Sequence, residues 1–177
     1  FKMSSFLIIY SSTDGHTKII CERIKNFLNN ENLAKLFSIE DVKKVDLSRF
    51  EKIIIGASIR YGKHSKELYN FIKLNKNILD QKKCAFFSVN VVARKPEKNT
   101  PETNPYINKF LKISKWTPNK IKVFAGKVDY PNYKLIDKYI IKLIMFITKG
   151  PTDTSQSYEF TDWSKVDDFS EELKNNY

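Results

Sequence analysis

Short, continuously apolar runs alternate along this chain with segments of helical periodicity. The runs at residues 5–10, 52–58 and 84–90 lack polar alternation, which is typical of strands buried on both faces of a parallel sheet. Residues 18–29 place apolar side chains three or four positions apart, as an amphipathic helix does. Strands that alternate with helices in this way predict a doubly wound α/β sheet with right-handed crossovers.

Weaker patterns complete one domain of five parallel strands over residues 3–177. They predict a strand at 34–39, a turn or short helix at 46–50, helices at 65–77, 106–115 and 162–173, a fifth strand at 121–128 and a short strand at 158–161. Phe1 and Lys2 precede Met3 and are interpreted as a non-native remnant, and no signal peptide is expected.

Residues 129–157 interrupt the alternation, so we expect an insertion that divides the last strand into two parts. It contains one helix candidate, about 133–149, with a wide apolar surface beside a narrow stripe formed by Lys134, Lys138 and Lys142. These lysines disfavour a membrane-spanning helix and favour one lying on an anionic membrane surface. Packing in the core or at an interface between two copies, as in a homo-oligomer, is the alternative.

A polar loop joins the first strand to the first helix, and its residues are Ser11, Ser12, Thr13, Asp14, Gly15, His16 and Thr17. A helix N-terminus offers unpaired N–H groups to an anion, hydroxyls add donors, and glycine permits a positive φ. The loop therefore predicts a phosphate site without Lys or Arg. The alternative is that Thr13 or Asp14 only caps the helix. Neither G-x-G-x-x-G nor a P-loop motif is present, which disfavours a dinucleotide or a nucleoside triphosphate.

The strand, hydroxyl-rich loop, Gly-x-Thr and helix together resemble the FMN phosphate loop of flavodoxins, although Asp14 is an extra residue before Gly15. The resemblance implies that two more loops flank the isoalloxazine ring: Ala57, Ser58, Ile59, Arg60, Tyr61 and Gly62, and Ser88, Val89 and Asn90. Tyr61 would stack on the ring, and backbone groups of the second loop would bond its edge. The alternatives are an ordinary half-buried Tyr61 and a solvated Arg60.

Several separated motifs are similar, in order, to the bacterial quinone-dependent protoporphyrinogen oxidases. They are IGASIRYG at 55–62, SVNVVARKPEKNTPETNPY at 88–106, IKLIM at 141–145, the cofactor-binding triplet Thr152, Asp153 and Thr154, and TDW at 161–163. The resemblance implies a long-chain flavodoxin-like fold with FMN. The reaction it implies is six-electron oxidation of protoporphyrinogen IX for heme synthesis, with menaquinone or ubiquinone as acceptor. It also implies a peripheral location on the cytoplasmic side of the bacterial inner membrane.

Three basic residues after the fourth strand, Arg94, Lys95 and Lys98, lie on the expected ligand edge and are candidates for binding the substrate propionates. A solvated basic loop is the alternative. No side chain is assigned a catalytic acid–base role. Two cysteines and two histidines without metal-type spacing predict no metal site.

The formal net charge of +11 indicates an anionic partner, but the basic residues are spread over many elements and no RNA-binding motif is present, so nucleic acid is not expected. Three other functions remain open. A stable semiquinone would favour a soluble flavodoxin-type electron carrier. Fast reduction of the flavin by NADPH would favour an NAD(P)H:quinone reductase. A protein that binds no added FMN would favour a cofactor-free basic binding module.

Overall fold

The computed structural model describes residues 3–175, so the expectation for Phe1 and Lys2 lies outside the described residues. Five parallel strands form one sheet in the order β2-β1-β3-β4-β5, which confirms the predicted doubly wound architecture. The strands are β1 (Ser5–Ser11), β2 (Leu33–Ser38), β3 (Lys52–Ser58), β4 (Lys83–Asn90) and β5 (Lys120–Ala125).

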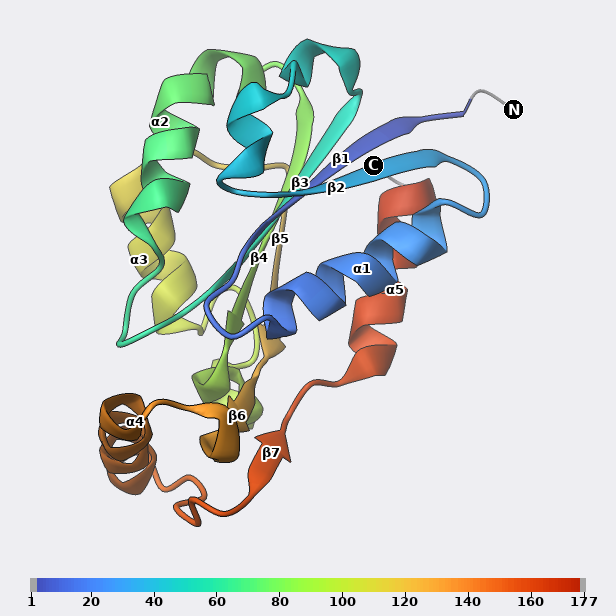
Figure 1. Ribbon diagram of the computed structural model, residues 1–177. Helices are drawn as coiled ribbons and strands as arrows, with labels where there is room; N and C mark the ends of the chain where they lie inside the picture. The colour runs from blue at the N-terminus through green and yellow to red at the C-terminus, as the bar shows by residue number, and fades with distance from the viewer. Residues whose placement is uncertain (1–2, 176–177) are drawn as a thin grey trace.

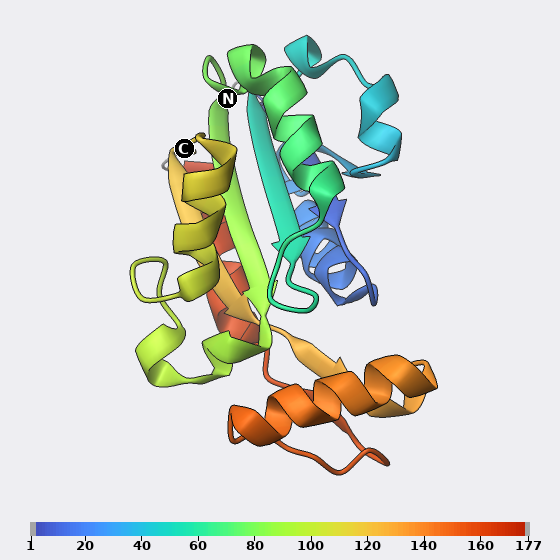
Figure 2. The same ribbon diagram turned by 90° about the vertical axis from the view of Figure 1, so that its left-hand side faces the viewer.

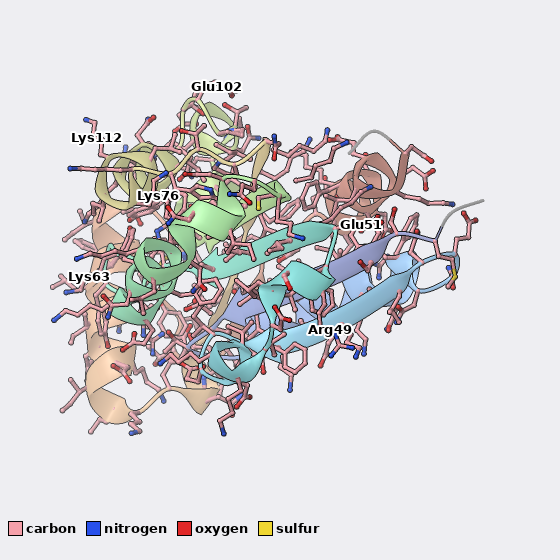
Figure 3. All side chains as sticks on the ribbon, turned by 90° about the horizontal axis from the view of Figure 1, so that it is seen from above. Arg49, Glu51, Lys63, Lys76, Glu102 and Lys112 are labelled. Carbon is pink, nitrogen blue, oxygen red and sulfur yellow. The ribbon has the colours of Figure 1, made fainter. Side chains whose placement is uncertain are left out.

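Two helices cover each face of the sheet (Figures 1 and 2): α1 (His16–Leu28) and α5 (Trp163–Asn175) on one side, α2 (Lys66–Leu79) and α3 (Pro105–Ser114) on the other. Alternate residues of each strand enter the two cores. Leu7 and Ile9 face α2 and α3, whereas Phe6 and Ile8 face α1 and α5. Charged side chains such as Lys63, Lys76 and Lys112 point outward (Figure 3).

Short 3-10 turns occupy Asp41–Lys44, Leu47–Arg49, Val91–Arg94, Pro96–Lys98 and Tyr130–Asn132. The turn predicted at 46–50 is therefore present, and the Ser65 hydroxyl caps α2 by accepting a hydrogen bond from the Leu68 N–H at 3.2 Å.

The insertion lies where it was predicted but does not divide a strand of the main sheet. The run expected as one strand at 121–128 breaks at Gly126. Beyond it, β6 (Lys127–Asp129) pairs antiparallel with β7 (Ser157–Glu159) in a separate hairpin, and β7 does not return to the five-stranded sheet. The buried Val128 explains this departure, because it packs with Tyr130 and Met145 in a small core of the insertion.

Helix α4 (Leu135–Ile147) lies beyond the carboxyl ends of the strands, beside β6 and β7 (Figures 1 and 2). Met145 is its one buried residue. We call its exposed apolar side chains the outer surface of α4: Leu135, Ile136, Tyr139, Ile140, Leu143, Ile144, Phe146 and Ile147, which are 39% to 74% exposed. Within residues 3–175, no helix is long and apolar enough to cross a bilayer.

Candidate functional site

The loop between β1 and α1, residues 11–17, has the backbone of an anion site. Gly15 has a φ of +90°, and a Cβ at that position would meet no atom within 4 Å, so its backbone faces open space. The Ser12 hydroxyl accepts a hydrogen bond from the Gly15 N–H at 2.9 Å. No side chain caps α1, so the alternative in which Thr13 or Asp14 caps this helix is wrong.

Thr17 sits in the first turn of α1, where the helix leaves unpaired N–H groups. Its side chain is 1% exposed, and among the described residues its hydroxyl is the buried side-chain polar atom that lacks a hydrogen-bond partner. Such a group costs about 1–3 kcal/mol unless a ligand completes it. The Ser11 hydroxyl, in contrast, already bonds the Ser65 hydroxyl at 3.0 Å. A phosphate oxygen therefore fits best beside Thr17.

Arg60 connects this loop to the insertion. Its guanidinium is 2.7 Å from the Asp14 carboxylate and 3.6 Å from that of Asp137 on α4, and it lies over the rings of Tyr61 and Tyr133. The alternative of a solvated Arg60 is therefore wrong. Burial raises the pKa of Asp14 even though the neighbouring Arg60 opposes that rise.

The Tyr61 side chain is hydrogen-bonded to the insertion. Its backbone has a φ of +50°, and its hydroxyl donates a hydrogen bond to Asp137. Stacking of this ring on a flavin stays a prediction.

His16 is held by the end of the insertion. Its Nε2 is 2.7 Å from the Thr161 hydroxyl, which in turn donates to the Ala125 carbonyl at 2.7 Å. Burial lowers the pKa of His16, while Glu159, 3.8 Å away, acts in the opposite direction. These contacts tie α1 to the segment that leaves β7.

The polar side chains at the end of β4 are hydrogen-bonded to other protein groups. The Ser88 hydroxyl bonds Nε2 of the buried His64 at 2.9 Å, and the Asn90 amide donates to Ser88 at 3.1 Å. The Asn104 side-chain amide donates a hydrogen bond to the side-chain Oδ1 of Asn90 at 3.0 Å. The backbone carbonyls of Val89 and Asn90 also accept hydrogen bonds, from the N–H groups of Ile59 and Gly126. Binding of a flavin edge by the backbone of this loop stays a prediction.

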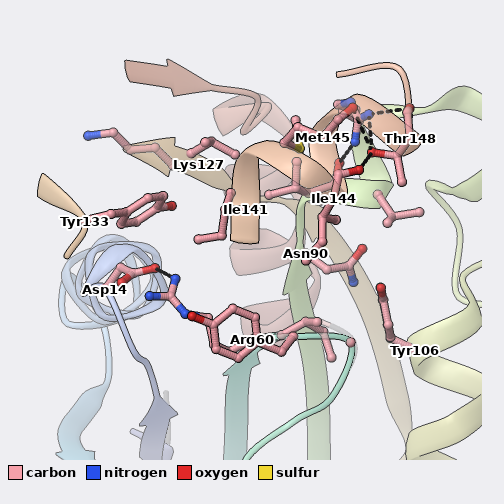
Figure 4. A pocket seen from close by; sticks show the side chains of 17 residues that line it. Asp14, Arg60, Asn90, Tyr106, Lys127, Tyr133, Ile141, Ile144, Met145 and Thr148 are labelled. Carbon is pink, nitrogen blue, oxygen red and sulfur yellow. Dashed lines mark hydrogen bonds and ion pairs between the residues drawn. The ribbon is translucent and has the colours of Figure 1, made fainter. Parts of the chain in front are cut away.

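Two adjoining cavities follow the carboxyl edge of the sheet. The first, which we call the phosphate groove, has a volume of about 380 Å³ and is lined by Ser12, Asp14, His16, Thr17, Ser58, Ile59, Val89, Asn90, Val91, Gly126 and Lys127. The second, the insertion cavity, has about 630 Å³ and lies between the sheet edge and α4, lined among others by Tyr106, Tyr133, Ile141, Ile144 and Met145 (Figure 4). Asp14, Ile59, Asn90, Val91 and Lys127 line both.

Some predicted residues do not reach these cavities. Thr152, Asp153 and Thr154 line neither, and the Asp153 carboxylate accepts hydrogen bonds from its own turn at Ser155. Lys95 and Lys98 are also not among the lining residues. The structure therefore does not bring these five residues to the site.

Arg94 does line the insertion cavity, but its guanidinium already bonds the carbonyls of Val91 at 3.0 Å and Thr148 at 2.9 Å. Sequence reasoning missed Tyr106, Tyr133 and Lys127. Lys127 lay inside the run predicted as one strand at 121–128, so its place at the ligand edge follows only from the break of that run at Gly126.

Residues 7–155 match the Flavodoxin domain family. Oxidised flavodoxin 1 from Bacillus cereus has a TM-score of 0.56 at 17% identity, covering 98% of this chain and 99% of that chain. Two-electron reduced flavodoxin from Megasphaera elsdenii has a TM-score of 0.51 at 14% identity, over 67% and 84%. In class, this is a flavodoxin-domain protein.

Two curated relatives define the family more closely, and both are named protoporphyrinogen IX dehydrogenase (quinone). The Escherichia coli protein is 39% identical over 94% of this chain and 93% of its own length. The Leishmania major protein is 42% identical over 94% of this chain and 73% of its own length. The chain belongs to the family of quinone-linked protoporphyrinogen IX dehydrogenases, which confirms the resemblance found in its motifs.

Proposed function

We propose that this chain holds FMN at the carboxyl edge of its sheet, oxidises protoporphyrinogen IX in heme synthesis and passes the electrons to a quinone. The observation that carries the cofactor assignment is the buried, unpartnered Thr17 hydroxyl at the start of α1, next to the open backbone of Gly15. These groups fit a phosphate monoester, and the adjoining insertion cavity is lined by aromatic and apolar side chains, among them Tyr106, Tyr133 and Ile141, that suit a ring system.

When bound, FMN supplies the redox chemistry. The chain positions and shields its ligands. Arg60 neutralises Asp14, which would otherwise repel a phosphate in the groove. The network of Ser88, Asn90 and Asn104 fixes the backbone at the end of β4. Apolar side chains of α4 exclude water from the insertion cavity.

The reaction is tested by mixing the FMN-loaded protein anaerobically with protoporphyrinogen IX. We expect the flavin absorbance to bleach while porphyrin absorbance appears, and added menaquinone or ubiquinone to restore the flavin. Bleaching by NADPH but not by the porphyrinogen would instead identify an NAD(P)H:quinone reductase.

The propionates of the substrate are proposed to lie toward the positive charges of the insertion cavity. Arg94 and Lys127 line it, and the bonds of Arg94 go to carbonyls and a hydroxyl rather than to a carboxylate. Lys127 is 3.6 Å from Asp129. Uncompensated charge at Arg94 favours a carboxylate ligand.

Comparing the porphyrinogen with its dimethyl ester tests this placement without altering the protein. We expect KM for the ester to be about tenfold higher, as loss of a charged hydrogen bond implies, and Lys127→Gln to reduce that ratio. Lys98→Gln is the control, since Lys98 does not line the cavity. An equal KM for acid and ester would refute the placement.

We further propose that the outer surface of α4 rests on the cytoplasmic face of the bacterial inner membrane. Eight large apolar side chains are exposed there, and Lys134, Lys142 and Lys149 are exposed on the same segment. Apolar burial at the acyl boundary and lysines at anionic headgroups suit this composition. The opposite side of α4 lines the insertion cavity, so a lipid-dissolved quinone would meet the cavity at the membrane surface.

Flotation with anionic vesicles tests membrane binding. Leu143→Glu with Phe146→Glu should abolish flotation of the full chain, because it places charge in the apolar boundary. Leu74→Glu on α2 is the matched control, since Leu74 is 83% exposed but lies outside the insertion. A concentration-dependent dimer that the double substitution dissociates, without flotation of the parent protein, would replace the membrane proposal by self-association.

A further inference from the structure

The insertion helix is attached to the body of the protein by few contacts, although it forms one wall of the insertion cavity. It contributes one buried side chain, Met145, to a core that is separate from the two cores of the sheet. Apolar packing of this extent does little to fix a helix of 13 residues. The polar contacts at the two ends of α4 therefore contribute to holding the helix in its position over the cavity.

The first of these contacts is at the amino end of α4. Asp137, in the first turn, is 3.6 Å from the Arg60 guanidinium and accepts a hydrogen bond from the Tyr61 hydroxyl. Arg60 is only 21% exposed in its side chain and also bonds Asp14 of the phosphate loop at 2.7 Å (Figure 4). One guanidinium thus joins the phosphate loop, the loop after β3 and the insertion.

The second contact is at the carboxyl end. Arg94 donates from one Nη to the Thr148 carbonyl at 2.9 Å and to its hydroxyl at 3.3 Å, and from the other Nη to the Val91 carbonyl at 3.0 Å. A helix carboxyl end carries partial negative charge and unpaired carbonyls, which a guanidinium satisfies. Gly150 leaves room for this side chain, because a Cβ there would lie 2.9 Å from an Arg94 Nη.

We infer that Arg60 and Arg94 are positioning residues that fasten the two ends of α4 over the insertion cavity, and that the two fastenings are unequal. The Arg94 fastening joins the end of α4 to the Val91 carbonyl and makes no bond to the loop at residues 11–17. The Arg60 fastening is shared with Asp14, so it links the place of α4 to the phosphate loop. Losing Arg94 loosens the cavity wall and leaves the loop at residues 11–17 without a broken bond, whereas losing Arg60 affects both the wall and that loop.

Hydrogen–deuterium exchange of the full chain without added ligand is the first test. In Arg94→Gln and Arg60→Gln, amides of residues 135–147 should exchange about tenfold faster than in the parent protein, since each change removes a charge-assisted bond. Arg23→Gln is the control because it removes a surface ion pair with Asp167, on α5. Unchanged exchange of residues 135–147 in both arginine variants would overturn the inference.

Two milder variants protect the test against misfolding. Asp137→Asn breaks the first fastening from the insertion side and leaves Arg60 on Asp14. Gly150→Ala displaces the flexible ends of Arg94 and Met145 and requires no unusual backbone angle. Each should accelerate exchange in α4 alone, and normal α4 exchange in both would count against the inference.

Ligand measurements separate the two fastenings, and this part rests on the proposed function. FMN affinity should fall about tenfold in Arg60→Gln and stay within twofold in Arg94→Gln and Asp137→Asn. With FMN-saturated protein, Asp137→Asn should raise KM for the porphyrinogen severalfold with little change in kcat, because only the wall is loosened. Equal FMN affinity in Arg60→Gln and Arg94→Gln would refute the inequality. A parent protein that binds no FMN would refute the proposed function while leaving the exchange result standing.

Discussion

At the scale of single residues, Thr17 differs from the other hydroxyls of the phosphate loop. Ser11 and Ser12 are engaged with protein partners, whereas the Thr17 hydroxyl is buried without one. A protein that keeps an unsatisfied buried hydroxyl loses stability at that position, and a bound phosphate recovers it. Under the proposed phosphate binding, the loop lowers the stability of the free protein and raises its affinity for the ligand.

Thr17→Val tests this exchange. Valine has the same shape and no hydroxyl, so the free energy of unfolding of the FMN-free protein should rise by about 1 kcal/mol. FMN affinity should fall roughly tenfold for the same reason. Urea unfolding and fluorescence titration measure the two effects, with Thr117→Val as a control at an exposed threonine outside the phosphate loop. A variant that is less stable than the parent would contradict the argument.

His64 makes stability depend on pH. It is buried against Ser88, and desolvation lowers its pKa to about 3 from an ordinary value of 6.5. Between about pH 3 and pH 6.5, His64 therefore binds a proton in the unfolded chain but not in the folded protein. The stabilisation is complete above pH 6.5 and is lost as pH falls toward 3, at up to about 1.4 kcal/mol per pH unit.

The free energy of unfolding should thus fall between pH 7 and pH 5, a window above most carboxylate titrations. In His64→Gln the fall should be smaller, and the remainder includes His16, whose pKa is also lowered by burial. Equal slopes in the parent and His64→Gln would show that His64 does not govern this window.

At the scale of elements, the sequence predicts the strands that are buried on both faces of the sheet and the amphipathic helices that cover it. The strands β1, β3 and β4 are continuous apolar runs, and the helix with Val166, Phe169 and Leu173 on one face is present as α5. The break at Gly126 was missed because the apolar residues on either side of it read as one strand. Whether Val128 pairs with β4 or packs under α4 depends on partners distant in the chain, which no local pattern contains.

The site follows the same division. The loop at residues 11–17 could be predicted as a phosphate site because its groups act through local backbone, and that role stays a prediction. The bonds of Arg60 to Asp14 and Asp137 join three separate segments and are not encoded in any spacing. The role of Thr152, Asp153 and Thr154 came from resemblance alone, and the structure leaves these residues on the loop between α4 and β7.

Gly56 fixes how β3 and β4 fit together. It is paired in register with Phe87, and a Cβ at Gly56 would overlap the Phe87 ring. Gly56→Ala should lower the free energy of unfolding by about 1–3 kcal/mol through overpacking. Gly126→Ala is the control, because its nearest atom would lie at an ordinary 3.4 Å. Equal urea midpoints for the two variants would disprove a tight fit at Gly56.

At the scale of the whole molecule, the insertion is an addition to a complete fold. The two cores of the sheet do not include its residues, and the hairpin register brings Asp129 opposite Ser157. The chain has a formal net charge of +11, and among residues 3–175 eight of the exposed large apolar side chains lie together on α4. The fold of the five-stranded sheet therefore does not depend on the insertion that carries the outer surface of α4.

Replacing residues 131–156 by a short glycine–asparagine turn should leave the sheet folded, with the free energy of unfolding within about 2 kcal/mol of the parent. Flotation on anionic vesicles should be lost because the apolar surface is gone. Urea unfolding and flotation of the same preparation measure both effects. Persistent flotation would locate the membrane contact elsewhere on the basic surface.

The two sides of helix α4 face different surroundings. Ile141 and Met145 line the insertion cavity, whereas Ile136, Leu143 and Ile147 are exposed on the outer surface of α4. Successive residues of a helix are turned by about 100°. Adding or removing one residue in this helix would therefore turn every later side chain by about 100° around the helix axis. Residues that line the cavity and residues that face outward would leave their places together, so one change would alter both the pocket lining and the docking face.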